Sequence, residues 1–249
     1  IRNNPAKQKK VKTKKQKAIA ATCAVAFWLL VWHVVSLCVG SELVLVSPVK
    51  VVQTLFTVIF DPDFLKTVWY SAARILGGFF TALTLGTVLG WVASRFWVVE
   101  TLLRPITAVI KATPVASFII LVLLWFSGKN LSVIISMLMV FPVIYMNVLE
   151  GIRSADEKLL EMAQVFRLSV GKKLLYIYLP AVAPFFVSAC SVSLGLCWKS
   201  GIAAEVIGTP DGSIGAVFYQ AKIFLQTSEL LAWTVVVVAV SVAFEKLFM

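Results

Sequence analysis

The sequence predicts an all-α integral membrane protein with about six transmembrane helices, from its composition and from the length of its apolar segments. Hydrophobic residues make up 60% of the 249 residues and charged residues only 14%, whereas soluble globular domains have about 45–50% and about 25%. A soluble fold of this size cannot bury so much apolar surface, but lipid can solvate it. A spanning helix needs about 20 mostly apolar residues. The segments that reach this length are about 18–39, 70–94, 106–126, 131–149, 181–204 and 230–248.

The first 17 residues form a basic tail ahead of the transmembrane domain of residues 18–249. The tail holds eight of the 23 Lys and Arg residues and no acidic residue. Such a tail can bind nucleic acid, but one followed directly by a span is typical of a cytoplasmic flank that contacts anionic lipid. The apolar segment after it is too long for a cleaved signal peptide. We therefore expect a cytoplasmic N-terminus, no nucleic-acid partner and a permanent first helix.

Two features modify this pattern of spans. Ser47-Pro48 is a typical helix start, and the apolar residues after it recur at helical spacing until Asp61-Pro62-Asp63. The sequence leaves open whether this short helix lies in the membrane interface or packs on the bundle. Pro114 and Pro142 fall inside the third and fourth spans, where we expect them to kink or locally unwind the helix.

Motifs for catalysis and for nucleotide binding are missing. A phosphate-binding P-loop needs Gly five residues before its Gly-Lys pair and Ser or Thr after it. Around Gly171-Lys172 these positions hold Phe166 and Lys173. The sequence also lacks a His-Glu-x-x-His zinc motif and a Gly-x-Ser-x-Gly nucleophile turn. We therefore expect no catalytic residue, no metal and no cofactor in this chain, and a membrane enzyme is a weak alternative.

The polar segment of about 150–180 predicts a short amphipathic helix outside the membrane. Ser154 and Glu157 have the spacing of a capping box, in which Ser caps the first amides and Glu reaches back. Leu159, Met162 and Phe166 then lie on one face. Such a helix either packs on its own bundle or inserts into a groove of a partner protein.

This segment resembles the EAA loop of ABC importer permeases. Glu161-Met162-Ala163 is followed, at the spacing of that loop, by Ile177-Tyr178-Leu179-Pro180. Ala203-Ala204-Glu205 and the later Gly212-Ser213-Ile214-Gly215 are similar to the nitrate/taurine/sulfonate-type branch of the family. The resemblance covers roughly residues 47–249, and the spacing of the EAA loop is its most specific part.

The resemblance implies a type I importer bundle and a mechanism. Two permeases, here expected to be identical, form the path in the bacterial inner membrane, and an extracytoplasmic solute-binding protein delivers the solute. Separate ATPase subunits bind ATP and Mg²⁺, and a coupling helix from each permease docks on them. The residues carried over to this coupling are Glu161, Met162, Ala163, Phe166, Arg167, Leu179 and Pro180.

Two residues depart from the family's pattern. Met162 stands where the family has Ala, and Arg167 stands where it has the Gly of the turn after the coupling helix. Glycine there would serve as a left-handed C-cap, a conformation that Arg adopts poorly. We therefore expect this turn to be built in another way, with Gly171 as a candidate.

Lys199 lies within the fifth predicted span, in the run Cys197-Trp198-Lys199-Ser200. A Lys at the bilayer centre costs about 2.5–3.5 kcal/mol on insertion scales, so it should face the bundle interior, water or a partner. It either attracts an anionic solute or pairs with Glu205 of the same or the other subunit. Glu205 is expected to end the fifth span near the outer surface and to shape an external gate. The candidate solute-path residues are Lys199, Ser200 and Glu205.

Two other classes of membrane protein, beside the membrane enzyme considered above, would have the same predicted spans. A secondary transporter or channel would work without ATP, but such proteins usually contain internal repeats, and we find no clear repeat here. The EAA-type loop also has no role in that reading. A scaffolding membrane subunit is the third alternative, and a failed transport assay would favour it.

Overall fold

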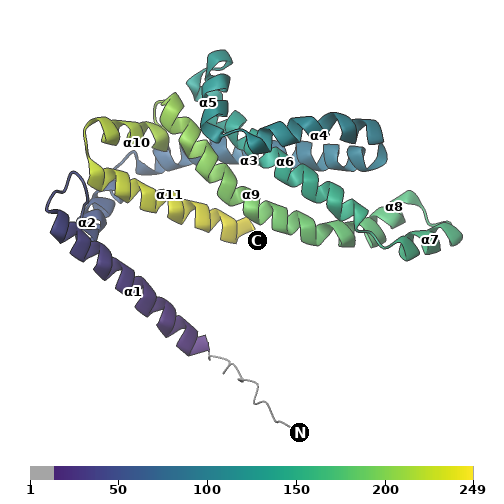
Figure 1. Ribbon diagram of the computed structural model, residues 1–249, viewed down its shortest axis with the longest axis horizontal. Coiled ribbons are helices and arrows are strands. Elements are labelled where there is room, and N and C mark those ends of the chain that lie inside the picture. Colours follow the sequence, from purple (N-terminus) through teal and green to yellow (C-terminus); the bar gives the residue numbers. More distant parts are fainter. Residues whose placement is uncertain (1–13, 249) are drawn as a thin grey trace, which may run out of the picture.

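A computed structural model of the chain describes residues 14–248 and is helical throughout its regular structure (Figure 1). The predicted basic tail lies outside the described residues up to residue 13, and the first helix already begins at Lys14. The elements are α1 (Lys14–Val39), α2 (Pro48–Ile59), α3 (Phe64–Arg95), α4 (Trp97–Ala112), α5 (Val115–Trp125), α6 (Gly128–Arg153), α7 (Glu157–Val165), α8 (Val170–Lys173), the π-helical turn η1 (Leu174–Tyr178), α9 (Leu179–Gly208), α10 (Ile214–Ile223) and α11 (Thr227–Phe248).

Among the described residues, five helices are long and apolar enough to cross a membrane: α1, α3, α6, the helix that includes α9, and α11. The pair α4 and α5 makes a sixth span if it is counted as one. The all-α bundle of about six spans is therefore confirmed. The third span is not the single helix expected over 106–126, because α4 and α5 meet at a bend of 110°.

Pro114 explains the break between α4 and α5. Proline has no N–H to donate, and it disfavours the helical conformation at the residue before it. Thr113 accordingly has extended dihedral angles, with φ −82° and ψ 134°. Pro142, by contrast, lies inside the uninterrupted helix α6. The two prolines predicted to disturb spans thus have different outcomes.

Helices α3, α6 and α9 form the core of the bundle. Its largest buried side chains include Phe79 from α3, Ile144 from α6 and Trp198 from α9. Small residues bring the backbones together, as is usual in membrane bundles. A Cβ atom at Gly78 would overlap the Val133 carbonyl oxygen on α6. The close approach of α3 and α6 therefore depends on glycine.

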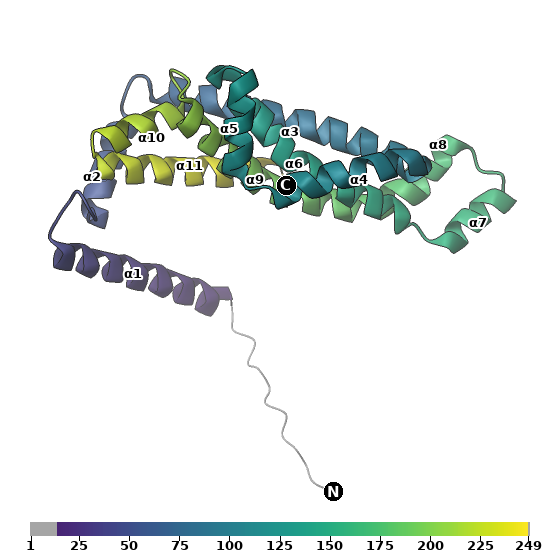
Figure 2. The same ribbon diagram turned by 45° about the horizontal axis from the view of Figure 1, so that its top comes forward.

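Helix α1 diverges from this core in both views (Figures 1 and 2). Its described apolar side chains are exposed along most of its length, and two hydrogen bonds hold its C-terminal end and the loop that follows. There Ser36 Oγ donates a hydrogen bond to the Leu45 carbonyl over 3.1 Å, and Thr227 Oγ1 donates to the Leu43 carbonyl over 2.8 Å. The body of α1 is thus left to contact lipid or another chain.

Helix α2 begins as predicted and packs on the bundle. Ser47 is its N-cap and accepts a hydrogen bond from the Lys50 N–H over 3.4 Å, with Pro48 at the first helical position. Val58 packs in one cluster with Ile214 of α10 and Trp233 of α11. The sequence left open whether this helix lies in the membrane interface or packs on the bundle, and the structure shows that it packs on the bundle.

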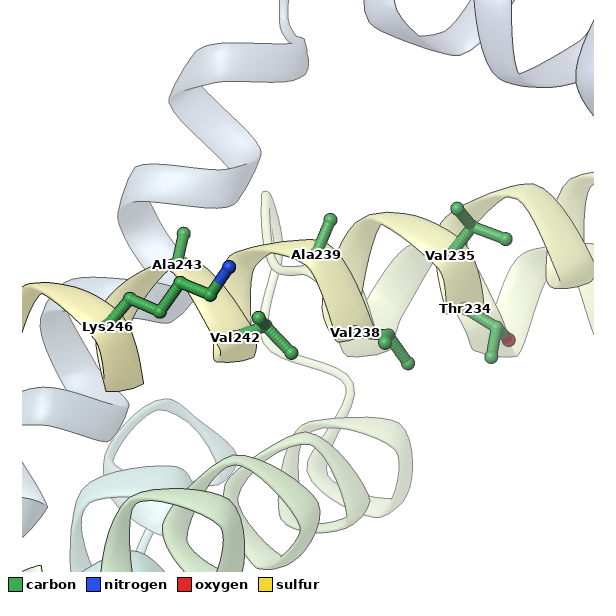
Figure 3. A pocket seen from close by; sticks show the side chains of 7 residues that line it. All are labelled: Thr234, Val235, Val238, Ala239, Val242, Ala243 and Lys246. Carbon is green, nitrogen blue, oxygen red and sulfur yellow. The ribbon is translucent and has the colours of Figure 1, made fainter. Parts of the chain in front are cut away.

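Helix α11 covers the core with one face and leaves another uncovered. Val235, Ala239 and Ala243 follow one another along this outer face, flanked by Val238 and Val242 (Figure 3). Of the residues that line this face, only Thr234 and Lys246 have polar side chains. The face is apolar for most of its length, as expected for a helix surface that meets lipid.

Candidate functional site

The loop that contains α7 projects from one end of the bundle, beyond the ends of α6 and α9 (Figure 1). Its first turn differs from the predicted capping box. Ser154 is the C-cap of α6, where its N–H donates to the Glu150 carbonyl and its Oγ to the Gly151 carbonyl. The N-cap of α7 is Asp156, whose carboxylate accepts from the Lys158 N–H over 2.9 Å. Aspartate is as good an N-cap as serine, so sequence could not separate the two.

The end of α7 is a Schellman motif with Arg167 at the left-handed position. Arg167 has φ +47°, its N–H donates to the Gln164 carbonyl over 3.0 Å, and the Leu168 N–H donates to the Ala163 carbonyl over 2.9 Å. These are the two hydrogen bonds that define the motif. The expectation of a differently built turn is therefore wrong. Gly171 lies in α8 and takes no part in it.

The inner face of α7 packs against the returning chain. Ala163 is 0% exposed and lies in one cluster with Ala155 and with Ile177 of η1. Leu160 and Leu168 cover this cluster. Ala163 is thus a packing residue of the loop rather than part of its exposed surface. Its small side chain lets α7 lie close to the segment that leads into α9.

The outer face of α7 is exposed and carries large apolar side chains beside charged ones. Val165 is 79% exposed and Phe166 72% exposed, with Met162 half-exposed beside them. Glu161 is also exposed. Exposed large apolar side chains that gather outside a membrane span are typical of a protein–protein contact. This outer face has the character of a docking surface.

The chain returns to the bundle through η1. The Leu179 N–H donates to the Leu174 carbonyl, five residues back. Pro180 has no N–H for a regular α-helical bond, and its ring crowds the preceding turn, so a wider π-helical turn forms here. Leu179 and Pro180 are exposed at the start of α9. From there α9 runs without a break to Gly208.

An ion pair joins the same end of the bundle to α4. Arg153, the last residue of α6, binds Glu100 in the first turn of α4 with an N···O distance of 2.5 Å. No local sequence pattern predicts this pair, because its members lie on two helices and are 53 residues apart. Both side chains are partly exposed, so the pair positions the helix ends more than it stabilises them.

Glu205 lies near the opposite end of α9, as expected, and its side chain is fully buried within the bundle. Its Oε2 accepts a hydrogen bond from Ser71 Oγ of α3 over 2.6 Å and one from the Gly215 N–H of α10 over 3.4 Å. Ser71 Oγ in turn accepts from the Ile214 N–H over 2.9 Å. A carboxylate at the positive N-terminal end of a helix is stabilised there. Glu205 therefore ties α3, α9 and the start of α10 together.

Lys199 does not belong to this buried network. It is exposed on α9 and forms no ion pair within the described part of the chain, so a pair with Glu205 of the same chain is excluded. Ser200 is buried, and its Oγ donates to the Leu196 carbonyl of its own helix over 2.9 Å. The three candidate solute-path residues thus have three different environments, and only Lys199 is open to a solute.

Sequence reasoning missed Ser71 and Gly215 as partners of Glu205. The Ser71–Glu205 contact joins residues 134 positions apart, and no local pattern encodes it. One signal was available: an acidic residue within an apolar span must find donors nearby.

The family model for the inner membrane component of binding-protein-dependent transport systems matches residues 82–246, which include the α7 loop and all of α9. The chain belongs to this family. It is similar to the putative aliphatic sulfonates transport permease protein SsuC of Bacillus subtilis, with 29% identity over 211 residues, 84% of this chain and 76% of the relative. The taurine transport system permease protein TauC of Escherichia coli is 27% identical over 220 residues, 86% of this chain and 80% of the relative.

The nitrate import permease protein NrtB of a Synechocystis strain is 25% identical over 214 residues, 82% of this chain and 76% of the relative. These relatives confirm the resemblance to the nitrate/taurine/sulfonate-type branch of ABC importer permeases. The chain is a permease subunit of an ABC importer, and it crosses a membrane several times.

Proposed function

We propose that this permease is driven by separate ATPase subunits that bind the outer face of α7. The observation that carries the proposal is the division of this helix into two faces. Ala163 and its neighbours hold α7 against the chain's own bundle, while Val165 and Phe166 project outward with no covering from the described residues. An amphipathic helix outside the membrane can pack on its own bundle or insert into a groove of a partner protein. In this proposal α7 does both, because one face packs inward and the other docks outward.

ATP and Mg²⁺ are bound by those partner subunits, and this chain supplies no nucleotide site or catalytic group. In support, the sequence around Gly171-Lys172 lacks the residues of a P-loop. The chain acts as the transport subunit, with its α7 loop and N-terminus in the cytoplasm. The excess of basic residues in the tail and in the 150–180 segment supports this orientation.

The motion of the ATPases reaches the outer end of the bundle through α9. Glu161, Met162 and Phe166 contact the ATPase, and Arg167 closes the turn that holds them in place. The α7 helix contacts Ile177 of η1, and Leu179 and Pro180 begin α9 directly afterwards. A displacement of α7 is therefore passed to a continuous helix whose far end carries Glu205, which holds α10 and α3.

The transported solute is a small anion, delivered by an extracytoplasmic solute-binding protein. Sulfonates, taurine and nitrate are the solutes in the names of the relatives, and Lys199 supplies an exposed cation on α9. A second copy of the permease completes the path. Ser200 and Glu205 are buried beside and beyond Lys199 and shape the path without contacting the solute.

The test uses the tagged permease expressed with its native ATPase and purified in detergent. Val165→Asp places a charge on the outer face of α7, whereas Val170→Asp makes the same change at α8, where the valine is 74% exposed against 79% at Val165. We expect the first variant to lose at least ten times more bound ATPase than the second, because only the first charge lies in the docking surface. Co-purified ATPase is quantified on a gel and by ATP hydrolysis.

Two outcomes would contradict the proposal. If both variants retained the ATPase equally, α7 would not be its docking surface. If no ATPase co-purified with the wild type and the reconstituted chain moved solute alone, the transport would be secondary and not driven by ATP.

A further inference from the structure

Two adjoining grooves lie between the end of α3, the end of α6 and the start of α9. One has a volume of about 580 Å³ and the other about 450 Å³. They share four lining residues, so they form one continuous surface feature, which we call the α3–η1 groove. The shared residues are Trp91, Ile152, Leu174 and Tyr178.

The α3–η1 groove is apolar at one end and basic at the other. Val148, Leu175 and Val182 line the first part with almost no polar surface. Arg95, in the last turn of α3, and Lys173, at the end of α8, line the second part. None of the residues that line either part is acidic. The groove therefore presents a long apolar wall that ends at two cations.

Neither cation has an ion-pair partner among the described residues, where the one salt bridge joins Arg153 and Glu100. Trp91 and Tyr178 lie at the junction of the two parts. Amphipathic aromatic rings of this kind concentrate at the level of lipid headgroups. In the proposed orientation, these rings place the basic part at headgroup level and the apolar part within the depth of the acyl chains.

We propose that the α3–η1 groove binds one anionic phospholipid, with its phosphate between Arg95 and Lys173 and an acyl chain along Val148, Leu175 and Val182. Charge complementarity selects this occupant, because basic pockets between helices bind acidic headgroups at the cytoplasmic surface. The leaflet rests on the proposed orientation, in which the α7 loop is cytoplasmic. The lipid would lie against η1, the turn that joins α7 to α9.

The test measures contact between lipid chains and Trp91 in nanodiscs that contain the full chain. Phosphatidylglycerol or phosphatidylcholine with brominated acyl chains is added at equal mole fraction, since bromine quenches nearby tryptophan fluorescence. The chain has eight Trp residues, so the signal of Trp91 is the difference between wild type and Trp91→Phe. We expect stronger quenching of this difference signal by the anionic lipid.

Charge removal makes the test specific. Arg95→Gln with Lys173→Gln should reduce the preference for phosphatidylglycerol about tenfold at low salt, since each basic residue contributes to binding an anionic surface. Lys66→Gln with Lys129→Gln removes two exposed cations at the other end of the bundle and should leave the preference unchanged. Native mass spectrometry of phosphatidylglycerol retained by each variant gives a second readout that does not need Trp91→Phe to fold.

Three results would overturn the proposal. Equal quenching by both lipids would show an apolar groove without headgroup selection. Quenching by neither would show that a second copy or another segment covers it. Relief of quenching by inorganic phosphate at the lipid concentration would show a site for the free ion. No ATPase subunit is present in the test, so its outcome is separate from that of the ATPase pull-down.

Discussion

The two ends of α9 are held in opposite ways. At its start, α7 is attached through small apolar contacts around Ala163, and the surface beyond them is exposed. At its far end, Glu205 is buried and held by hydrogen bonds from Ser71 and Gly215. Apolar contacts tolerate sliding, whereas buried hydrogen bonds have steep distance and angle requirements. The α7 end is therefore suited to receive a partner, and the Glu205 end to switch between discrete arrangements.

The largest effect should come from removing the buried carboxylate. Glu205→Ala leaves Ser71 Oγ and the Gly215 N–H without their acceptor, and we expect a loss of about 3 kcal/mol in unfolding free energy. Glu161→Ala removes an exposed carboxylate at the α7 end and should change stability by less than about 0.5 kcal/mol. Unfolding in mixed detergent measures both. Equal losses of unfolding free energy from the two variants would mean that the Glu205 end of α9 is held no more firmly than the α7 end.

A smaller effect is expected where α10 meets α9. A Cβ atom at Gly215 would overlap the backbone and Cβ of Glu205, whereas one at Gly195 on α9 would meet nothing within 4 Å. Gly215→Ala should therefore cost about 1–3 kcal/mol through overpacking, while Gly195→Ala should be neutral or slightly stabilising. Thermal unfolding compares the two variants. A neutral Gly215→Ala would mean that α10 is not firmly docked on Glu205.

A stabilising change is expected at the turn after α7. Arg167 adopts a left-handed conformation, as does Leu225 at the corresponding turn after α10. Glycine at either position relieves backbone strain, and we expect a gain of about 0.5–1 kcal/mol from each substitution. Gln164→Gly, inside α7, should instead lose about 1 kcal/mol. If Arg167→Gly lowered the melting temperature, Arg167 would make a contact that outweighs its strain.

The smallest effect concerns the ion pair at the α7 end. A double-mutant cycle with Glu100→Gln and Arg153→Gln should give a coupling below about 1 kcal/mol, because both side chains are partly exposed, at 28% and 49%. The coupling should fall further as salt is added. A coupling above about 2 kcal/mol that resists salt would mean that this end is held as firmly as the Glu205 end.

Sequence patterns predicted the features that depend on local composition. The spans expected over 70–94, 131–149, 181–204 and 230–248 lie within α3, α6, α9 and α11, respectively. Span length follows from counting apolar residues against bilayer thickness, which requires no knowledge of neighbours. The α7 helix was found for the same reason, since its amphipathic spacing is local.

The features that failed or were missed depend on contacts between distant segments. Proline at position 114 predicts a break, but the direction of α5 after it depends on packing against α6 and α9. Two good N-cap residues precede α7, and only the end of α6 decides that Asp156 is used. The environment of Glu205 requires Ser71 and the start of α10, which the fold alone brings together.

The uninterrupted length of α9 has a mechanical consequence. Its 30 residues span about 45 Å at 1.5 Å per residue. A tilt of only about 5°, pivoting at one end, would move the other end by about 4 Å over that length. This exceeds the tolerance of a hydrogen bond, so Glu205 could not keep both Ser71 and Gly215 through such a stroke. Under the proposed function, a small rotation imposed on α7 by the ATPase would therefore break the contacts of Glu205 and release α10 in an all-or-none manner.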